Sequence, residues 1–175
     1  MKKTALLVID VQNLLIRENP RNKELFITTI NRLIRDFRKN ELPIIFIQHT
    51  NDAEIPEGSE AWQIWHEIEA EASDKRFSKS FMSAFKGTGL DAHLKENDID
   101  SLVICGMQTD FCVDTTCRVA FELGYSLYIP EDATTTFDDK YLSAEQIQKH
   151  HELIWSYRLA KVAPADEILS EILKG

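Results

Sequence analysis

The sequence predicts an α/β fold in which helices cover a parallel sheet. Short apolar runs, each suited to a buried strand, alternate with segments whose apolar residues recur at helical spacing. This alternation is typical of β-α-β units. The chain of 175 residues is long enough for one sizeable core and too short for two complete domains. We therefore expect residues 1–175 to form a single domain.

The apolar runs and the helical spacings define the expected elements. Strands are expected at 5–9, 44–48, 102–106 and 126–129, with weaker ones at 76–80 and 160–162. The segment between the first two strands carries an apolar helix face, formed by Phe26, Ile30, Leu33 and Phe37. Further helices are expected at 90–97, 110–123, 143–157 and 164–173. Ser143 and Gln146 fit a capping box, and Pro164 suits a first helical turn.

Residues 52–74 form an unusually acidic segment, without a single Lys or Arg. After the turn-like Pro56-Glu57-Gly58, apolar residues recur at helical spacing at Ala61, Trp65, Ile68 and Ala72. We expect an inserted helix here. It would cover a site, lie at a subunit contact, or simply dock its apolar stripe on the domain with its acidic face in solvent.

Composition excludes several classes of protein. A formal net charge of −9 argues against nucleic-acid binding, which relies on clustered Lys and Arg. No stretch approaches the ~20 apolar residues of a membrane helix. The apolar start is too short for a signal peptide and is interrupted by Asp10, so no targeting segment is expected. Three cysteines without CxxC spacing fit neither a disulfide framework nor a zinc site and indicate a reducing cytoplasm.

Candidate functional residues follow the predicted strands, because ligands of parallel sheets bind beyond the carboxyl ends of the strands. Asp10 ends the first strand, Gln48 and His49 end the second, and Gly106-Met107 ends the strand that leads to Cys112. A carboxylate directly after an apolar strand must be paired or hydrogen-bonded. Asp10 is therefore either a functional group or the N-cap of a helix.

The thiol of Cys112 is expected in the first turn of a helix capped by Thr109 or Asp110. The free backbone N–H groups and the helix dipole at such a place would lower its pKa. Cys105 and Cys117 are better explained as buried packing residues. Among the lysines, Lys79 stands out because it lies between aromatic residues in RFSKSFMSAF.

Four segments, in order, resemble the isochorismatase-like cysteine hydrolases, a family that includes nicotinamidases, carbamoylsarcosine amidohydrolase and streptothricin-type hydrolases. The segments are LLVIDVQN, FSKSFMSAFKGTGL, LVICGMQTDFCVDTT and PEDATTTF. The resemblance implies a three-layer α/β/α sandwich with a six-stranded, mostly parallel sheet. It also implies a catalytic triad of Asp10, Lys79 and Cys112, a cis peptide between Met107 and Gln108, and an oxyanion hole formed by the N–H groups of Gln108 and Cys112.

The activity that the resemblance implies is hydrolysis of a C–N bond in a small amide, ureide or lactam. Asp10 would take the proton of Cys112, Lys79 would stabilise the thiolate, and sulfur would attack the carbonyl to form a thioester. Asp10 would then protonate the leaving amine and activate water. The isochorismate-cleaving branch lacks the nucleophilic cysteine, so Cys112 argues against that branch.

The resemblance also bears on the pocket and on metals. Gln12, Leu15 and Trp62 or Trp65 are similar to pocket walls of the family, or else they are core or dimer contacts. Nicotinamidases carry an Asp-x-His…His metal set after the second strand, whereas QHTNDAEIPEG lacks that spacing. We therefore expect no metal and no cofactor, with His49 and Asp52 as possible remnants of such a set. A homodimer or homotetramer is expected from the resemblance.

Two other functions are compatible with the residues. Cys112 could form a sulfenate in a thiol redox or sensor protein, with Cys105 or Cys117 as its resolving partner. The domain could also be a non-catalytic module that binds a ligand, because a fold does not fix a function. A dinucleotide enzyme is not expected, because no G-x-G-x-x-G follows the first strand.

Overall fold

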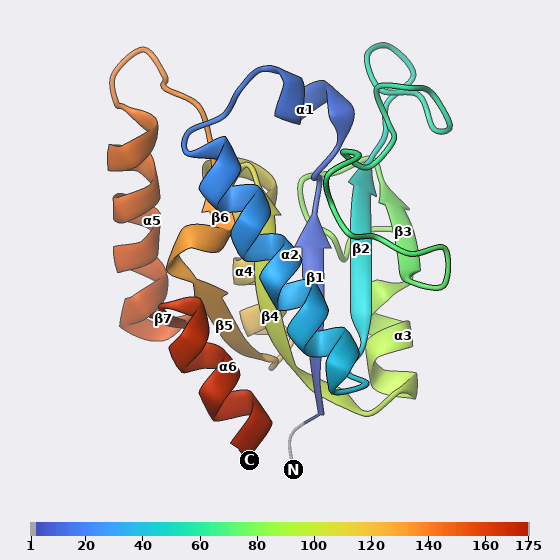
Figure 1. Cartoon of the computed structure of the whole chain (residues 1–175), viewed down its shortest axis with the longest axis vertical. Coiled ribbons are helices and arrows are strands. Elements are labelled where there is room, and N and C mark those ends of the chain that lie inside the picture. Colours follow the sequence, from blue (N-terminus) through green and yellow to red (C-terminus); the bar gives the residue numbers. More distant parts are fainter. Residues whose placement is uncertain (1–2, 175) are drawn as a thin grey trace.

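The computed structural model, which describes residues 3–174, contains one sheet in the order β3-β2-β1-β4-β5-β7, with β6 beside β4 (Figure 1). Its strands are β1 (Lys3–Ile9), β2 (Ile44–His49), β3 (Lys75–Lys79), β4 (Ile99–Met107), β5 (Ser126–Pro130), β6 (Thr134–Thr135) and β7 (Lys161–Ala163). All the pairings between these strands are parallel. The expected α/β sandwich is confirmed, with one strand more than expected. The additional strand, β6, has two residues, too few to give a hydrophobic pattern.

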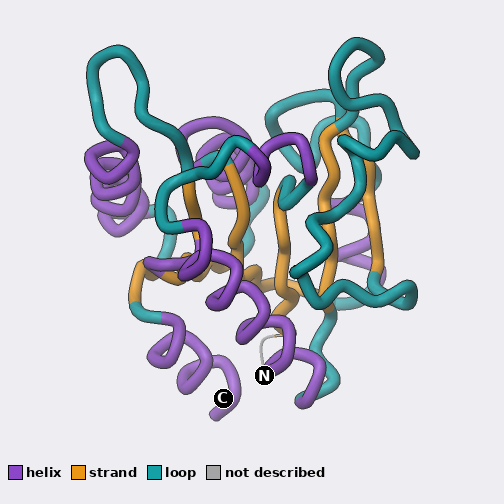
Figure 2. Tube along the Cα trace, turned by 45° about the horizontal axis from the view of Figure 1, so that its top comes forward, coloured by secondary structure: helices purple, strands orange, loops and turns teal. Residues whose placement is uncertain are grey.

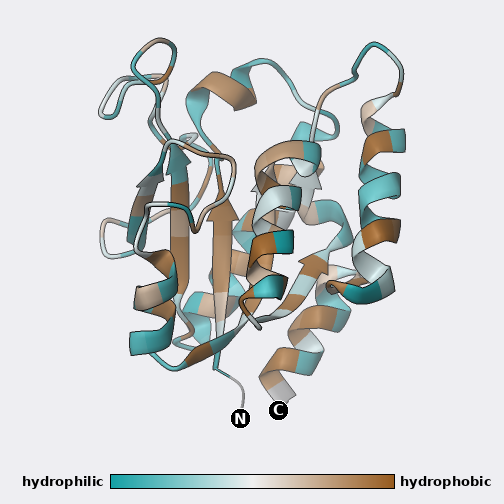
Figure 3. Cartoon of the chain, turned by 180° about the vertical axis from the view of Figure 1, so that it is seen from behind, coloured by the Kyte–Doolittle hydropathy of each residue, from teal (hydrophilic) through white to brown (hydrophobic). Residues whose placement is uncertain are grey.

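Helices cover both faces of the sheet (Figures 1 and 3). They are α1 (Asn13–Arg17), α2 (Lys23–Lys39), α3 (Leu90–Glu96), α4 (Asp114–Glu122), α5 (Ala144–Arg158) and α6 (Ala165–Lys174). Alternate residues of β1 point to opposite faces: Leu6 and Val8 pack with α2 and α6, whereas Leu7 and Ile9 pack with α3 and α4. Within residues 3–174, no helix is both long and apolar enough to span a bilayer.

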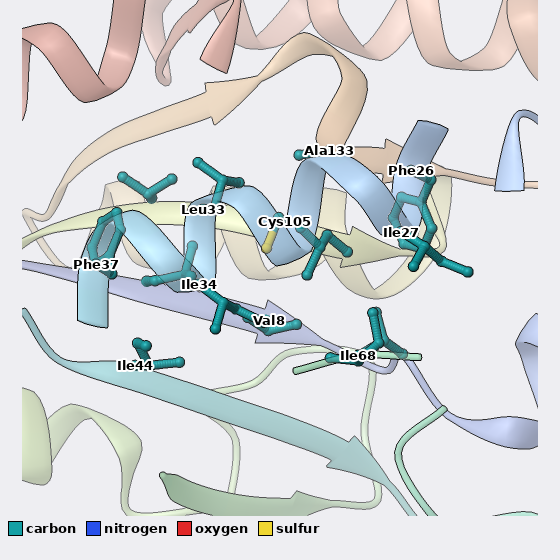
Figure 4. Packing of buried hydrophobic residues seen from close by; sticks show 14 of the residues in the cluster. Val8, Phe26, Ile27, Leu33, Ile34, Phe37, Ile44, Ile68, Cys105 and Ala133 are labelled. Carbon is teal, nitrogen blue, oxygen red and sulfur yellow. The ribbon is translucent and has the colours of Figure 1, made fainter. Parts of the chain in front are cut away.

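Helix α2 packs along β1 and β4 with the apolar face that the spacing predicts (Figure 4). Phe26, Ile30, Leu33 and Phe37 are all completely or almost completely buried. Burying a side chain of this size contributes roughly 1.5–3 kcal/mol, so this face fixes α2 on the sheet. The capping box of Ser143 and Gln146 at the start of α5 is also confirmed.

The prediction of a helix within residues 52–74 is wrong. The connection between β2 and β3 is loop throughout (Figure 2). Its internal backbone bonds close isolated turns and form no continuous helix. Other groups bond to the segment after β1: Asn13 N donates to Gln63 O at 2.9 Å, and Trp65 N donates to Val11 O at 2.9 Å. Ile68 is buried against the core with 6% exposure, and Trp65 packs there partly buried, whereas Ala72 is exposed. Their spacing therefore reflects contact with a distant segment and not a helical turn.

The helix expected at 110–123 begins differently from the expectation. One wide π-helical turn, η1 (Thr109–Val113), precedes α4. Neither Thr109 nor Asp110 caps it: the Thr109 hydroxyl donates to Thr134 Oγ1, and Asp110 accepts from the Thr136 hydroxyl. These bonds tie the turn that carries Cys112 to the segment around β6.

The carboxyl ends of four neighbouring strands meet at one edge of the sheet. In the ladder, Ile9 of β1 lies beside Ile47 of β2 and Gly106 of β4, and His49 of β2 lies beside Lys79 of β3. The central strands are apolar on both faces because helices or loops cover both. Polar groups at this edge are therefore the ones available for chemistry.

Candidate active site

Asp10, Lys79 and Cys112 come together at this edge, from three different strands. Asp10 directly follows β1, Lys79 ends β3, and Cys112 lies in the turn after β4. The Nζ atom of Lys79 is 2.7 Å from Asp10 Oδ2 and 3.1 Å from Cys112 Sγ. All three residues are buried, with exposures of 1%, 2% and 9%. The lysine side chain reaches past the end of β2 to make both contacts.

The Lys79 ammonium contacts four other residues of this site. Besides Asp10 and Cys112, its Nζ lies 3.2 Å from the carbonyl oxygen of Phe81 and 3.3 Å from Nδ1 of His49. An ammonium group has three N–H bonds and cannot accept. With four neighbours around three protons, the ammonium is held in place from every side and can shift its hydrogen bonds between carboxylate and sulfur.

The Asp10 backbone adopts a left-handed conformation, with φ of 52°. Asp and Asn tolerate this region better than most residues. The Asp10 N–H donates to Ile47 O at 2.9 Å, which continues the β1–β2 pairing to the last residue. Asp10 does not cap a helix, because α1 begins at Asn13 after the N-cap Gln12. The turn instead directs the carboxylate towards Lys79.

Burial dominates the ionisation of the site. It raises the pKa of the Asp10 carboxyl above its usual range, although the nearby Lys79 ammonium opposes that shift. Burial, and after it the negative charge of Asp10, raise the pKa of the Cys112 thiol to about 12. The low pKa expected for Cys112 is therefore wrong, since these effects outweigh the helix terminus. At rest the site holds a protonated thiol beside the Asp10–Lys79 ion pair.

A pocket of about 270 Å³ opens onto this group. Asp10, Cys112 and Gln108 are among the residues that line it, and five apolar side chains form much of the rest: Leu14, Leu15, Ile55, Met82 and Phe111. The peptide bond Met107–Gln108 is cis. The Gln108 carbonyl oxygen accepts from the N–H groups of Phe111 and Val113, at 3.2 and 3.1 Å. These bonds fasten the turn that presents Cys112.

Of the residues expected to bind substrate, only Leu15 lines the pocket. The Gln12 side chain is fully buried and accepts from His49 N at 2.8 Å while donating to His49 O and Trp62 O at 3.0 and 2.9 Å. Gln12 thus joins β2 to the 52–74 loop. The contribution of Trp62 is its backbone carbonyl, which also accepts from Gln48 Nε2 at 3.0 Å. Gln12 and Trp62 therefore support the pocket wall through hydrogen bonds and do not line the pocket.

Of the pocket residues, the sequence singled out His49 but did not reveal Asn51, Glu54, Met82 or Phe111. The strand-end position of His49 was a signal for it. Asn51 and Glu54 lie in the connection between β2 and β3, which docks on residues 11–14. Met82 lies in the loop after β3, and Phe111 lies in η1. Loop positions of that kind follow from long-range contacts and leave no periodic pattern in the sequence.

The other two cysteines are remote from this pocket. Cys105 packs in the cluster beneath α2, on the opposite face of the sheet from Cys112, and its thiol contacts Leu7 O at 3.7 Å. Cys117 is fully buried in α4. Burial raises the pKa of both thiols. In residues 3–174, no group of three or more His, Cys, Asp or Glu side chains is arranged to hold a metal ion.

We expect His49 to be neutral at pH 7, with its proton on Nε2. The Lys79 ammonium can only donate, so His49 Nδ1, at 3.3 Å, must accept. Burial, and after it the charge of Lys79, hold the pKa of His49 below its usual 6.5. An NMR titration of the imidazole nitrogens should show the Nε2–H tautomer and protonation only below pH 6.5. Signals of a ring protonated on Nδ1 at neutral pH would contradict this assignment.

Comparison with known proteins agrees with this architecture. The Isochorismatase domain family matches residues 4–154. Isochorismatase family protein YddQ of Bacillus subtilis is 32% identical over 155 residues, which span 82% of this chain and 86% of that protein. Nicotinamidase 3 of Arabidopsis thaliana is 28% identical over 79% of this chain and 76% of its own. A crystal structure of an isochorismatase family protein has a TM-score of 0.89 and 36% identity, over 93% of this chain and 99% of that one. The chain therefore belongs to the isochorismatase family of hydrolases.

Proposed function

We propose that the protein is an amidohydrolase that uses Cys112 to cleave the C–N bond of a small amide, ureide or lactam through a thioester. The observation that carries the proposal is the position of the Lys79 ammonium, 2.7 Å from an Asp10 oxygen and 3.1 Å from Cys112 Sγ. A nucleophile, a base and a cation in mutual contact at the end of a pocket are the parts that covalent catalysis needs.

The contacts of Lys79 explain how a thiol with a high pKa can attack. When the Cys112 proton moves to Asp10, one negative charge leaves the carboxylate and appears on sulfur. Both atoms lie within hydrogen-bond reach of Lys79 Nζ, so the ammonium balances the charge before and after the transfer. The raised pKa of Asp10 makes the carboxylate a stronger base, which favours proton transfer as sulfur bonds to the carbonyl carbon.

The remaining steps use Asp10 twice more. Protonated Asp10 gives its proton to the leaving nitrogen as the C–N bond breaks, which leaves a thioester on Cys112. Asp10 then takes a proton from water, whose oxygen attacks the thioester carbon. As the C–S bond breaks, sulfur regains a proton and the acid product departs. The carboxylate thus acts as base, acid and base in turn.

The backbone N–H groups of Gln108 and Cys112 are the proposed donors to the oxyanion of the tetrahedral intermediates. Gln108 and Cys112 both line the pocket beside Asp10. Loss of one such donor costs about 3 kcal/mol in well-studied hydrolases. The similarity to nicotinamidase 3, whose name states that it hydrolyses an amide, supports the choice of an amide as substrate. The scheme involves no metal and no cofactor.

We expect Cys112→Ala to lower ammonia release by at least ~10⁴-fold, because no other group can form the thioester. The measurement is ammonia release from a panel of small amides and ureides, and ring opening by mass spectrometry for lactams, with and without a chelator. Cys117→Ala is the matched control, since it removes a buried thiol from the same strand-turn-helix unit and should retain turnover. Full activity of Cys112→Ala would refute the proposal, and loss of activity with chelator would refute its metal-free part.

A further inference from the structure

The charged side chains that line the pocket are acidic. Asp10 and Glu54 both line it, whereas the described part of the chain contributes no Lys or Arg to its wall. The nearest cation, Lys79, has a completely buried side chain and lies 2.7 Å from Asp10, so its charge is balanced locally. His49 also faces the pocket, but its contact with Lys79 keeps it neutral. The negative charge of Glu54 is therefore left without a counterion inside the pocket.

Glu54 is held at the pocket by a compact turn. The side-chain oxygen of Asn51 accepts from Glu54 N at 2.7 Å and from Ala53 N at 3.0 Å. Asn51 N donates to Ile55 O at 3.3 Å, and the Thr50 hydroxyl donates to the same oxygen at 3.1 Å. Among the residues that the structure describes, none forms an ion pair with the Glu54 carboxylate. The turn thus fixes the backbone of Glu54 at the pocket and leaves its exposed carboxylate unpaired on the pocket wall.

The rest of the wall strengthens the effect of this charge. Leu14, Leu15 and Ile55 are apolar and screen a charge less than water does. Phe111 also lines the pocket, and its ring is half-exposed at 49%. The face of an aromatic ring attracts cations. A carboxylate and an aromatic ring on one small pocket favour a positively charged group and repel an anionic one.

We propose that Glu54, assisted by Phe111, is a specificity-determining residue that selects amides carrying an ammonium or guanidinium group and rejects those carrying a carboxylate. This inference rests on the proposed function, because it assumes that the substrate carbonyl meets Cys112. Glu54 takes no part in bond breaking. It acts by raising the local concentration of cationic molecules at the thiol and by holding their charged end away from it.

The test uses two thiol reagents of opposite charge and requires no knowledge of the substrate. The cationic 2-aminoethyl methanethiosulfonate and the anionic 2-sulfonatoethyl methanethiosulfonate react alike: the Cys112 sulfur loses its proton and attacks the reagent's divalent sulfur, a mixed disulfide forms, and methanesulfinate leaves. We measure the ratio of the two rates by mass spectrometry and divide it by the same ratio for free 2-mercaptoethanol. Cys112→Ala identifies labelling at other sites.

The normalised ratio, measured at low ionic strength because Glu54 is exposed to solvent, is expected to favour the cation in the wild type. It should fall about three- to tenfold in Glu54→Gln, which removes one carboxylate charge from the pocket wall. Asp52→Asn is the matched control: Asp52 is an exposed acid two positions away that does not line the pocket. That variant should leave the ratio unchanged. An unchanged ratio in Glu54→Gln, or an equal fall in Asp52→Asn, would overturn the inference.

The experiment separates this inference from the proposed function. If the amide panel gives no Cys112-dependent turnover but the labelling ratio depends on Glu54, the charge selectivity holds and the amidase proposal fails. If amides are cleaved in a Cys112-dependent way but the labelling ratio does not change in Glu54→Gln, the amidase proposal holds and the charge selectivity fails. With an active substrate in hand, Glu54→Gln should raise KM for cationic amides by about three- to tenfold while kcat changes little, because Glu54 binds and does not react.

Discussion

Replacement of Lys79 by methionine is expected to lower the free energy of unfolding by about 3–5 kcal/mol and amide turnover by roughly 10²–10³-fold. Methionine has nearly the length of lysine but no charge, so it leaves the Asp10 carboxylate buried without its counterion. The Asp10–Lys79 contact of 2.7 Å involves two side chains that are 1% exposed or less. Urea denaturation measures the first effect, and steady-state kinetics on an active amide measure the second.

The double variant Asp10→Asn/Lys79→Met is the control for this experiment. It removes both charges, and asparagine tolerates the left-handed backbone of Asp10, at φ 52°. We expect it to regain most of the lost stability but none of the lost activity, because removing a whole buried pair costs far less than removing one partner. A double variant no more stable than Lys79→Met alone would show that the loss comes from packing and not from the unpaired charge.

The pH dependence of stability is an independent test of whether the unpaired Asp10 charge causes the loss in Lys79→Met. Without Lys79, the folded-state pKa of Asp10 rises further above its usual 3.8, because burial then loses its main opponent. A group with a raised folded pKa weakens the fold as pH increases through that pKa. The stability deficit of Lys79→Met should therefore shrink towards acid pH, where Asp10 is neutral in both states. A deficit that is constant with pH would assign it to lost contacts of the lysine chain.

The sequence predicted those parts of the structure that local pattern determines. The central strands β1, β2 and β4 are apolar runs, and the face of α2 with Phe26, Ile30 and Phe37 follows the helical period. The proximity of Asp10 to Cys112 follows from the rule that strand ends share one edge. The segment around Trp65 had an equally regular spacing, yet it forms no helix. Trp65 N and Gln63 O bond to residues some fifty positions away, and the bonds within the segment close only isolated turns. Nothing within the segment distinguishes these outcomes.

The ionisation of Cys112 could not be predicted from its own turn. A helix start favours thiolate, and that argument uses only neighbouring backbone. The groups that determine the pKa come from elsewhere in the chain: the carboxylate of Asp10 after β1, and the apolar cluster that buries the sulfur. Lys79 likewise reaches the site from a strand that is not adjacent to either partner. Such electrostatic effects appear only when the tertiary structure is known.

Replacement of Gly106 by alanine is expected to destabilise the fold by more than about 4 kcal/mol, the range reached by severe packing faults. Gly106 has φ of +123°, and an added Cβ would lie 2.1 Å from Ile9 O and 2.6 Å from Ile9 N. Both are backbone atoms of the neighbouring central strand, so they cannot move without separating β1 from β4. Unfolding in urea, or the loss of soluble folded protein, measures the effect.

The variant Gly124→Ala is the control that distinguishes the steric clash of an added Cβ from the strain of a positive φ. Gly124 also has a positive φ, of +91°, but an added Cβ there would meet no atom within 4 Å beyond its chain neighbours, so alanine should cost only about 1–2 kcal/mol. Equal stability of the two variants would contradict the packing argument. Ile9 directly precedes Asp10, and Gly106 directly precedes the Met107–Gln108 peptide. The contact that only glycine permits thus sets the spacing between the proposed base and the turn that carries the proposed nucleophile.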